Sequence, residues 1–417
     1  MHINTSANGG GVAELIRAVI FSSNGGRSDL GWAVVRGGPQ FYSFTKNLHH
    51  LLHGRGAPSE LLTAGAGRDV YRETLALALA DIVAMVRPGD LVVLHDPQTL
   101  GLAPGLALHG IRVMWHCHVG SRSDPSGAKS LVWRYFSADL QAVERVVVTH
   151  GEYLKDAPVG AVEEARPAIW ADSPKNAPMT ADQVNTRLTE LGLHESGPVE
   201  TEISRVWQAH SLPSSGLVVL QVGRWDPLKG ITAVLRCSEH FGRNVHLVLA
   251  GPDPREVVDD PEGRAELDEV LRVFHALSSD VRARTHIVAM AMVGNDRDSN
   301  EYRVNALQRR ADIVVQKSVE EGFGLAVTEA MYKSKPIVAS RIGGLDGQVI
   351  HGVNGFLVGI DEDDEFIASV VRLCEDRPLR LEFGRRGRQR VTENYLIERL
   401  VSDYDNMMHG GPPSWTP

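Results

Sequence analysis

Short apolar runs alternate with longer amphipathic stretches along the whole chain. Buried parallel strands have nearly continuous apolar sequences, so this alternation is typical of parallel sheets that helices cover on both faces. We therefore predict an α/β fold with two sheets and a helix over residues 68–86. The strands of the first sheet are expected at 30–35, 91–96, 111–119 and 145–150, and those of the second at 216–223, 245–251, 285–290, 311–316 and 335–340.

A polar stretch, "HSLPSSG" (210–216), separates the two groups of strands and has the composition of an interdomain linker. A chain of 417 residues also exceeds one core of ordinary size. We therefore predict four segments along the chain. They are an N-terminal domain over 1–209, a second domain over 210–390, a helix over 391–409 that packs back on the first domain, and a disordered tail over 410–417.

Composition excludes several classes of protein. No window approaches the roughly 18 uninterrupted apolar residues of a membrane span, and the start "MHINTSANGG" lacks the basic leader and apolar core of a signal peptide, so a cytoplasmic location is expected. A net charge of -9 argues against nonspecific nucleic-acid binding. Three widely spaced cysteines, Cys117, Cys237 and Cys374, indicate reduced structural thiols and neither a disulfide framework nor a zinc site.

The stretch "EEGFGLAVTEAM" (320–331) follows the expected strand 311–316. Ligands of open α/β sheets bind beyond the carboxyl ends of strands. The two glycines suit a tight turn into a helix that begins near Gly324, whose free N–H groups attract phosphate. Glu321 in the loop is then placed for sugar hydroxyls, and Glu329, between one and two helical turns further on, for the paired hydroxyls of a ribose. The alternative is an acidic first turn that complements the helix dipole by about 0.3–1 kcal/mol.

A second stretch, "VGRWDPLKG" (222–230), favours the ligand-binding interpretation. Arg224 and Lys229 follow an expected strand, and both cations are placed to converge on a diphosphate. The alternative is that both are solvated surface charges, as most Arg and Lys side chains are.

Candidate residues also follow the strands of the first sheet. "SANGGGVAELI" (6–16) brings three glycines into a helix start, but without the spacing of a dinucleotide-binding or P-loop motif. Strand alternation puts His116 and His118 on one face and Cys117 on the other. A His-x-His pair can bind metal, but no clear third ligand is near in the sequence, so we predict no metal site. His118, nearest the strand's carboxyl end, and Asp96 are the candidate acceptor-binding residues.

Several stretches together resemble glycosyltransferase family 4, over nearly the whole chain. Within that family the chain is most similar to the trehalose synthases that join a nucleotide-glucose donor to free glucose. The stretches that carry the resemblance are "NTSANGGGVAELI", "FYSFTKNLHHLLHG", "VVLHDPQ", "WHCHVGSRSDPS", "SPKN", "GRWDPLKGI", "DDPEG" and "EEGFGLAVTEAMYKSKPIV". The resemblance implies the GT-B architecture, two Rossmann-like parallel-sheet domains that face a central cleft.

The resemblance also implies roles for individual residues. Glu321 holds the donor sugar, Glu329 the ribose, and Arg224 with Lys229 the diphosphate. His118 contacts the donor sugar near the reaction centre. The remaining donor-binding candidates are backbone or loop positions, namely Gly10, Gly11, Gly322, Phe323, Gly324 and Leu325. Two stretches depart from the family pattern, "PAIWADSPKN" (167–176) and "ASRIGGLDGQVIHG" (339–352), and leave donor and acceptor identity open.

The family retains the donor's anomeric configuration, which implies a front-face substitution without an enzyme nucleophile. Arg224, Lys229 and the helix start at Gly324 then stabilise the leaving diphosphate, and His118 and Glu321 complete the catalytic set. No cofactor is required, and any effect of magnesium is expected to be secondary. The expected donor is ADP-, UDP- or GDP-glucose, and the expected acceptor is glucose or a related sugar. The sequence does not decide whether the protein forms a homodimer.

Three alternatives remain at this point. A trehalose phosphorylase has the same fold but uses inorganic phosphate, and a natural-product glycosyltransferase has the same donor site with another acceptor. A sensor that binds a sugar nucleotide without turning it over is the third.

Overall fold

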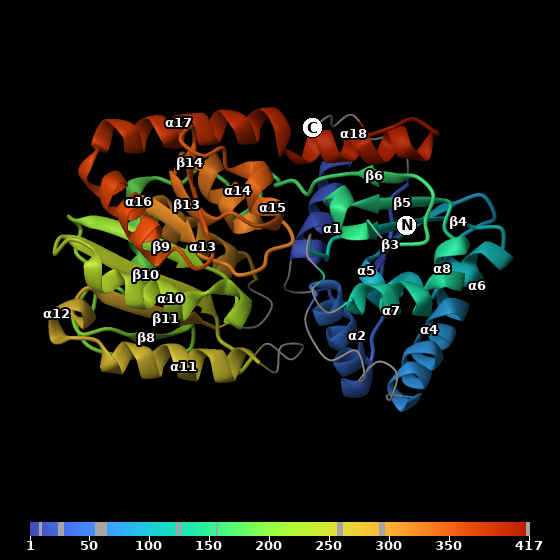
Figure 1. The fold of residues 1–417 in the computed structure, drawn as a ribbon, viewed down its shortest axis with the longest axis horizontal. Helices are drawn as coiled ribbons and strands as arrows, with labels where there is room; N and C mark the ends of the chain where they lie inside the picture. Colours follow the sequence, from blue (N-terminus) through green and yellow to red (C-terminus); the bar gives the residue numbers. More distant parts are fainter. Residues whose placement is uncertain are drawn as a thin grey trace. The chain divides into compact units, whose positions relative to one another are not determined.

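The computed structural model describes residues 1–7, 11–23, 29–54, 65–121, 124, 127–155, 157–256, 262–291 and 297–413. The chain forms two compact units. The first comprises Met1–Ile169 and Tyr395–Pro417, and the second comprises Trp170–Asn394. Each unit has a sheet at its centre with helices on both faces (Figure 1).

The sheet of the first unit is entirely parallel within the described chain, with the strand order β2-β1-β3-β4-β5-β6. Its strands are β1 (His2–Asn4), β2 (Trp32–Val34), β3 (Leu91–His95), β4 (Arg112–Cys117), β5 (Arg145–Val148) and β6 (Val162–Glu164). Its helices are α1 (Gly11–Ser22), α2 (Pro39–Leu52), α4 (Gly65–Met85), α5 (Asp96–Leu100), α6 (Ala103–Leu108), α7 (Ala128–Tyr135), α8 (Ser137–Gln141) and α18 (Ile397–Met408), with a 3-10 turn, η1 (Gly151–Leu154).

Strand β4 shows how the two faces of this sheet differ. Val113, Trp115 and Cys117 are buried in an apolar core that side chains of α2, α4 and α7 complete. His116 points to the opposite face, where its Nδ1 lies 2.6 Å from the hydroxyl of Tyr404 on α18. The side chains of β4 therefore enter an apolar core on one face of the sheet and a region of buried polar rings on the other.

The sheet of the second unit has the order β14-β13-β12-β9-β10-β11-β8-β7, in which only the pairings of β8 with β11 and with β7 are antiparallel among the described strands. Its strands are β7 (Val199–Glu200), β8 (Ser204–Trp207), β9 (Leu217–Val222), β10 (Val245–Pro252), β11 (Thr285–Met290), β12 (Ile313–Gln316), β13 (Ile337–Ser340) and β14 (Gly355–Val358). Its helical segments are α9 (Ala181–Glu190), η2 (Pro227–Lys229), α10 (Ile231–Cys237), η3 (Ser238–His240), α11 (Gly263–Ala276), α12 (Ser279–Arg282), α13 (Arg297–Arg310), α14 (Leu325–Tyr332), α15 (Gly343–Gln348), α16 (Asp363–Glu375) and α17 (Arg377–Asn394).

All nine strands expected from the apolar runs are present, and the helix expected over 68–86 is α4. The α/β class and the GT-B type of fold are thus confirmed. The sequence did not indicate β6, β7, β8 or β14, which are short or lie at a sheet edge.

The domain boundary expected after residue 209 is wrong, because the second unit begins at Trp170. Strand β8 pairs with β11, so it belongs to the second sheet. The stretch 210–216 is therefore a loop inside the second unit. Arg310 fixes it there by donating from Nη2 to the carbonyl oxygens of Pro213, at 2.9 Å, and Gly216, at 3.3 Å. Its polar composition suits a surface loop as well as a linker.

The segment predicted to return to the first domain contains α18, which lies in the first unit. The chain leaves this unit at Ile169 and re-enters it at Tyr395, where the Ile169 N–H donates to the Tyr395 carbonyl at 2.9 Å. Of the tail predicted to be disordered, 414–417 lie outside the described residues, and the N–H of Gly411 donates to the carbonyl of Asn406.

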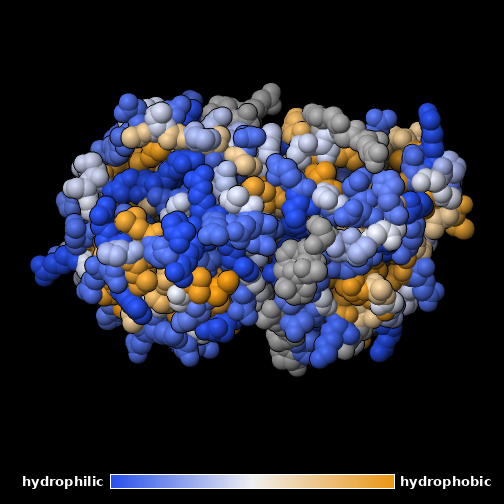
Figure 2. Space-filling model, turned by 90° about the horizontal axis from the view of Figure 1, so that it is seen from above, coloured by the Kyte–Doolittle hydropathy of each residue, from blue (hydrophilic) through white to orange (hydrophobic). Residues whose placement is uncertain are grey.

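The surface drawn in Figure 2 is mainly hydrophilic, with small separated apolar areas. Helix α17 contributes exposed polar residues, among them Arg385, Arg386 and Gln389. None of the helices in the described part of the chain combines the length and the hydrophobicity that crossing a membrane requires.

Candidate functional site

Two loops of the second unit meet at the carboxyl ends of neighbouring parallel strands, β9 and β12. The loop after β9 carries Lys229 and the loop after β12 carries Glu321. Lys229 Nζ lies 2.6 Å from Glu321 Oε2, and the two side chains are 21% and 11% exposed. The same Oε2 accepts from the side chains of Gln316 at 3.5 Å and Ser318 at 3.4 Å. The proposed sugar carboxylate and one proposed phosphate cation are thus held as an ion pair.

The geometry of the Lys229 loop depends on two residues beside it. Asp226 caps the 3-10 turn η2 by accepting from the N–H of Leu228 at 2.8 Å. Gly230 then has a φ of 61°, and a Cβ there would lie 2.1 Å from the carbonyl oxygen of Lys317. Only glycine allows both the left-handed backbone and this close approach. Arg224 is half-buried in the same loop, two residues beyond β9.

Helix α14 begins where the sequence predicts, with Gly324 as its N-cap residue at a φ of 88°. A Cβ on Gly324 would lie 2.6 Å from Leu345 Cδ2, so helix α15 approaches this turn closely. Gly322 and Leu325 on either side are partly exposed. Phe323 is buried, and its carbonyl accepts from Gln348, which ties this loop to α15.

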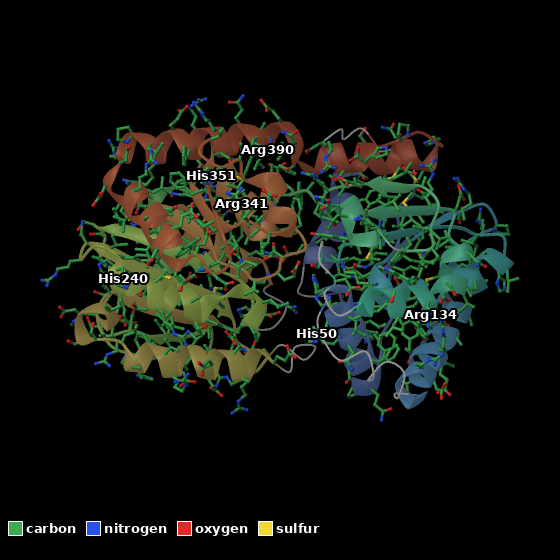
Figure 3. All side chains as sticks on the ribbon, viewed as in Figure 1. His50, Arg134, His240, Arg341, His351 and Arg390 are labelled. Carbon is green, nitrogen blue, oxygen red and sulfur yellow. The ribbon has the colours of Figure 1, made fainter. Side chains whose placement is uncertain are left out.

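The end of α15 is fixed in turn by Arg390 of α17, which Figure 3 labels. Arg390 donates to the carbonyl oxygens of Gly347 at 2.7 Å and Gln348 at 3.0 Å. The segment 339–352, which departs from the family pattern, therefore supports the turn that precedes α14.

Glu329 lies on α14 and is only 4% exposed. Its Oε1 is 3.7 Å from Lys175 Nζ, and its Oε2 accepts from Gln308 at 3.5 Å. Sequence reasoning missed Lys175, because the expected boundary assigned "SPKN" to the other domain. The departure of "PAIWADSPKN" from the family pattern drew attention to this segment. The sequence did not show that Lys175 lies beside Glu329.

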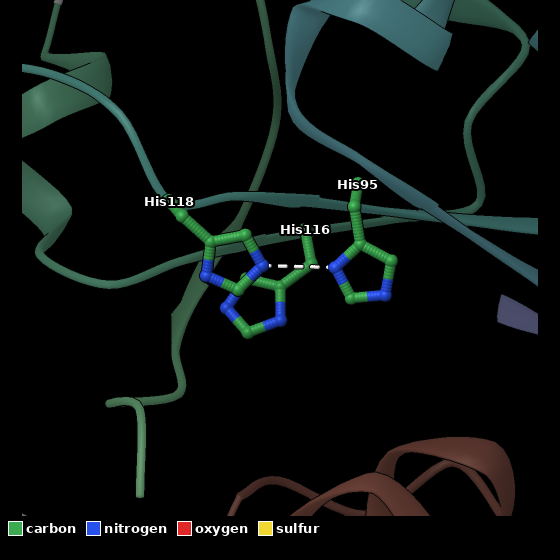
Figure 4. A group of neighbouring side chains, drawn as sticks. All are labelled: His95, His116 and His118. Atoms are coloured by element: carbon green, nitrogen blue, oxygen red, sulfur yellow. Dashed lines mark hydrogen bonds between the residues drawn. The ribbon is translucent and has the colours of Figure 1, made fainter. Parts of the chain in front are cut away.

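Three histidines of the first unit form a hydrogen-bonded chain. His2 Nδ1 lies 2.9 Å from His95 Nε2, and His95 Nδ1 lies 2.9 Å from His118 Nε2. Figure 4 shows the second of these contacts, with the ring of His116 beside it. A neutral imidazole has one N–H and one acceptor nitrogen, so the tautomers of the three rings are set together.

Burial keeps these rings neutral. It lowers the pKa of His2 and that of His118 to about 3. It also lowers the pKa of His95 and that of His116 well below the ordinary value, and the neighbouring rings add to the effect. His118, which is 9% exposed, is therefore a neutral hydrogen-bonding group at physiological pH.

Asp96 begins α5 directly after β3, in the left-handed region with a φ of 60°. Such a backbone is uncommon outside glycine and is typical of functional positions. The carboxylate accepts the backbone N–H of His118 at 2.7 Å, which brings the two acceptor-binding candidates together. Burial raises the pKa of Asp96 to about 7, against the opposing hydrogen bonds from the backbone of His118 and Val119.

The ring nitrogens of His95, His116 and His118 come within 4.8 Å of one another, which is a set of neutral ligands of the kind that zinc prefers. His95 is the third candidate ligand, which the sequence did not reveal. The 2.9 Å contact between His95 and His118 requires a proton between them and uses one nitrogen of each. Two of the three rings, His95 and His118, are thus joined by a hydrogen bond, and the cluster would have to rearrange to hold an ion.

Gly11 opens α1 and is exposed, whereas Gly10 lies outside the described residues.

The two units have the topology of the GT-B fold, which glycosyltransferases share. The second unit places its charged loops and a helix start at the carboxyl edge of its sheet. Residues 2–155 match the family model "Trehalose synthase, N-terminal domain", and residues 205–390 match "Glycosyl transferases group 1". The trehalose synthase of Rubrobacter xylanophilus is 31% identical over 411 residues, which cover 97% of this chain and 88% of that protein. The chain belongs to the trehalose synthase family and is a trehalose-related hexosyltransferase.

Two further proteins are informative. The trehalose phosphorylase of Pleurotus pulmonarius is 26% identical over 94% of this chain, but only 54% of that protein is covered. The UDP-forming α,α-trehalose-phosphate synthase of Burkholderia xenovorans, solved with glucose 6-phosphate, has a TM-score of 0.73. That comparison covers 98% of this chain and 99% of the other at 13% identity, which is a likeness of fold.

Proposed function

We propose that the enzyme transfers glucose from a nucleoside diphosphate glucose to free glucose and so forms α,α-trehalose with retention of configuration. The observation that carries this proposal is the Lys229–Glu321 ion pair at the carboxyl edge of the second sheet. It joins a cation suited to a diphosphate with a carboxylate suited to sugar hydroxyls. The trehalose synthase of Rubrobacter xylanophilus, which aligns over nearly the whole chain, supports the choice of product.

The donor would bind through the second unit. In this proposal the diphosphate takes hydrogen bonds from Arg224, Lys229 and the first N–H groups of α14, whose positive helix end favours an anion. When the diphosphate draws Lys229 away, Glu321 is left as an acceptor for the hydroxyls of the transferred glucose. Glu329, beside Lys175, is assigned the ribose hydroxyls. The nucleotide is ADP, UDP or GDP.

The acceptor would bind through Asp96 and His118 of the first unit. A buried, neutral His118 orients a sugar hydroxyl by hydrogen bonding and does not act as a cation. Asp96, with its raised pKa, accepts or donates a hydrogen bond near neutral pH. The chain His2–His95–His118 selects which nitrogen His118 offers.

Catalysis would then be electrostatic. The acceptor hydroxyl attacks the anomeric carbon from the face that the diphosphate leaves, and a phosphate oxygen takes its proton. Arg224, Lys229 and the α14 helix start stabilise the negative charge that develops on the leaving group. No carboxylate acts as a nucleophile in this scheme, and any effect of magnesium would be secondary.

Product analysis tests the proposal. The enzyme is incubated with ADP-, UDP- or GDP-glucose and free glucose, and proton NMR should show an α,α-1,1-linked disaccharide together with free nucleoside diphosphate. The reverse reaction should convert trehalose and nucleoside diphosphate to nucleotide sugar and glucose. A β-linked product would refute retention, and a retained linkage formed only with another acceptor would refute trehalose synthesis while leaving the donor site intact.

The resemblance to the Pleurotus pulmonarius trehalose phosphorylase favours a phosphorylase as the second candidate. That activity would cleave trehalose with inorganic phosphate and would not need a nucleotide. Binding of a nucleotide sugar without any product would instead indicate a sensor.

A further inference from the structure

A basic pocket of about 360 Å³ lies in the second unit and is lined by side chains other than Lys229 and Glu321. Four of the side chains that line it are cationic, namely Arg309 and Arg310 at the end of α13 and Lys333 and Lys335 after α14. Ala181 and Asn185 on the first turns of α9 form part of the opposite wall and are exposed to solvent. None of the described residues that line the pocket is acidic.

Backbone carbonyl groups hold these cations in place. Arg309 Nη2 donates to the carbonyl of Ala177 at 2.9 Å, and Lys335 Nζ donates to the carbonyl of Arg309 at 2.7 Å. Arg310 is tied to Pro213 and Gly216 as described above. A neutral carbonyl fixes a cation without cancelling its charge, so the pocket is preorganised and remains positive.

Two acids lie near the four cations. Arg310 Nη1 is 3.5 Å from Asp312 Oδ2, and Glu329 attracts Lys333. Burial, and after it the neighbouring cations, lowers the pKa of Lys333 to about 7 in spite of Glu329. Burial also lowers the pKa of Lys335 to about 8. Burial is the largest cause of each shift, and the charge of Arg309 adds to both.

We propose that this pocket is a binding site for a phosphate-bearing small metabolite. An oxyanion would supply the missing negative charge, and paired Arg and Lys side chains are the groups that recognise phosphate best. The first turns of α9 add the positive end of a helix dipole. The volume exceeds what a bare phosphate needs and lies in the range of small-molecule sites, so the wall at Ala181 would receive the rest of the ligand.

Lys333 links this pocket to the proposed ribose carboxylate. Its Nζ donates to Asn176 Oδ1 at 2.8 Å and to the carbonyl of Glu329 at 3.2 Å. Lys175, the residue before Asn176, pairs with Glu329. Lys333 therefore contacts both the backbone of Glu329 and the neighbour of its partner Lys175. An anion that attracts Lys333 would disturb these contacts and so change the affinity for the donor. This coupling rests on the proposed function, whereas the binding site itself does not.

Isothermal titration calorimetry with inorganic phosphate and with glucose 6-phosphate tests the site on the full-length protein. The main variant is Asn185→Asp, which adds a carboxylate at an exposed lining position and removes no cation. We expect it to weaken binding of at least one probe about tenfold, equivalent to about 1.4 kcal/mol. Asn185→Gln is the matched neutral control and should bind as the unsubstituted protein does. Lys335→Met should weaken binding similarly, and a melting curve checks that it folds.

Arg224→Ala separates this pocket from the donor site. If a probe still binds to Arg224→Ala but not to Asn185→Asp, the result supports phosphate binding in the pocket. This conclusion holds even if the proposed role of Arg224 in donor binding fails. Binding that is lost in Arg224→Ala and kept in Asn185→Asp overturns the inference, because the probe would then occupy the donor site. No measurable binding of either probe also overturns it.

Discussion

Replacing Glu321 with Gln should separate turnover from nucleotide binding. The variant keeps the shape of the side chain but removes the charge that Lys229 Nζ contacts at 2.6 Å. Hydrogen bonds to a charged group contribute about 1.5–3 kcal/mol, so loss of the sugar contacts should lower kcat by about 10- to 150-fold. Lys229 is meanwhile released from a partly exposed ion pair worth about 1 kcal/mol, so the nucleoside diphosphate should bind up to about fivefold more tightly.

Steady-state kinetics and calorimetry with the nucleoside diphosphate measure the two effects on one protein preparation. Glu320→Gln, which removes the same charge one residue earlier in the loop, is the control and should leave both quantities nearly unchanged. Normal turnover in Glu321→Gln would refute its assignment to the transferred sugar. Diphosphate affinity that falls in parallel with turnover would refute the idea that the carboxylate competes with the diphosphate for Lys229.

Three further predictions concern single residues or pH. Arg224→Ala should weaken binding of the nucleoside diphosphate by about 10- to 150-fold in calorimetry, the effect of losing a charged hydrogen bond, and unchanged affinity would return Arg224 to the solvated surface. His95→Phe keeps a ring but removes the hydrogen bonds to His2 and His118, so kcat should fall about tenfold or more and its pH profile should change. The affinity for the diphosphate should stay constant. A loss of diphosphate affinity equal to the loss of kcat would contradict a positioning role. Acid should destabilise the first unit, because the pKa of His2 and of His118 is about 3 when folded and 6.5 when unfolded, so only the unfolded chain takes up these protons as the pH falls from 7 to 5. Each of these two histidines lowers the free energy of unfolding by about 2 kcal/mol between pH 7 and pH 5, and the other buried rings add to this loss. Asp96, whose pKa is raised, opposes it by about 2 kcal/mol. A melting temperature that holds steady down to pH 5 would disprove this account.

The strands were predictable because most of them are buried on both faces and have continuous apolar sequences, as in "LVVLQV" of β9. Edge strand β7, with two residues, and the alternating β8 carry no such signal. The boundary between the units was not predictable from composition, since a polar loop and a polar linker look alike until a partner such as Arg310 is known.

Side chains on one strand were placed more reliably than contacts between strands. Alternation correctly put His116 and His118 on one face of β4, where their ring centroids are 3.9 Å apart, and Cys117 in the core on the other. The chain from His2 to His95 could not be foreseen, because it depends on β1 lying beside β3, 93 positions away in the sequence. The Lys229–Glu321 pair was missed for the same reason, although both residues were named separately.

The return of the chain to the first unit has a consequence for its synthesis. The second unit is an insertion between Ile169 and Tyr395, so the ribosome completes it before α18 emerges. Until then the first unit lacks Tyr404, the hydroxyl partner of His116 on the buried polar face of its sheet. The first unit is therefore the earlier to begin and the later to finish folding. The direct hydrogen bond between Ile169 and Tyr395 also means that its two pieces could be joined by a short loop into one continuous domain.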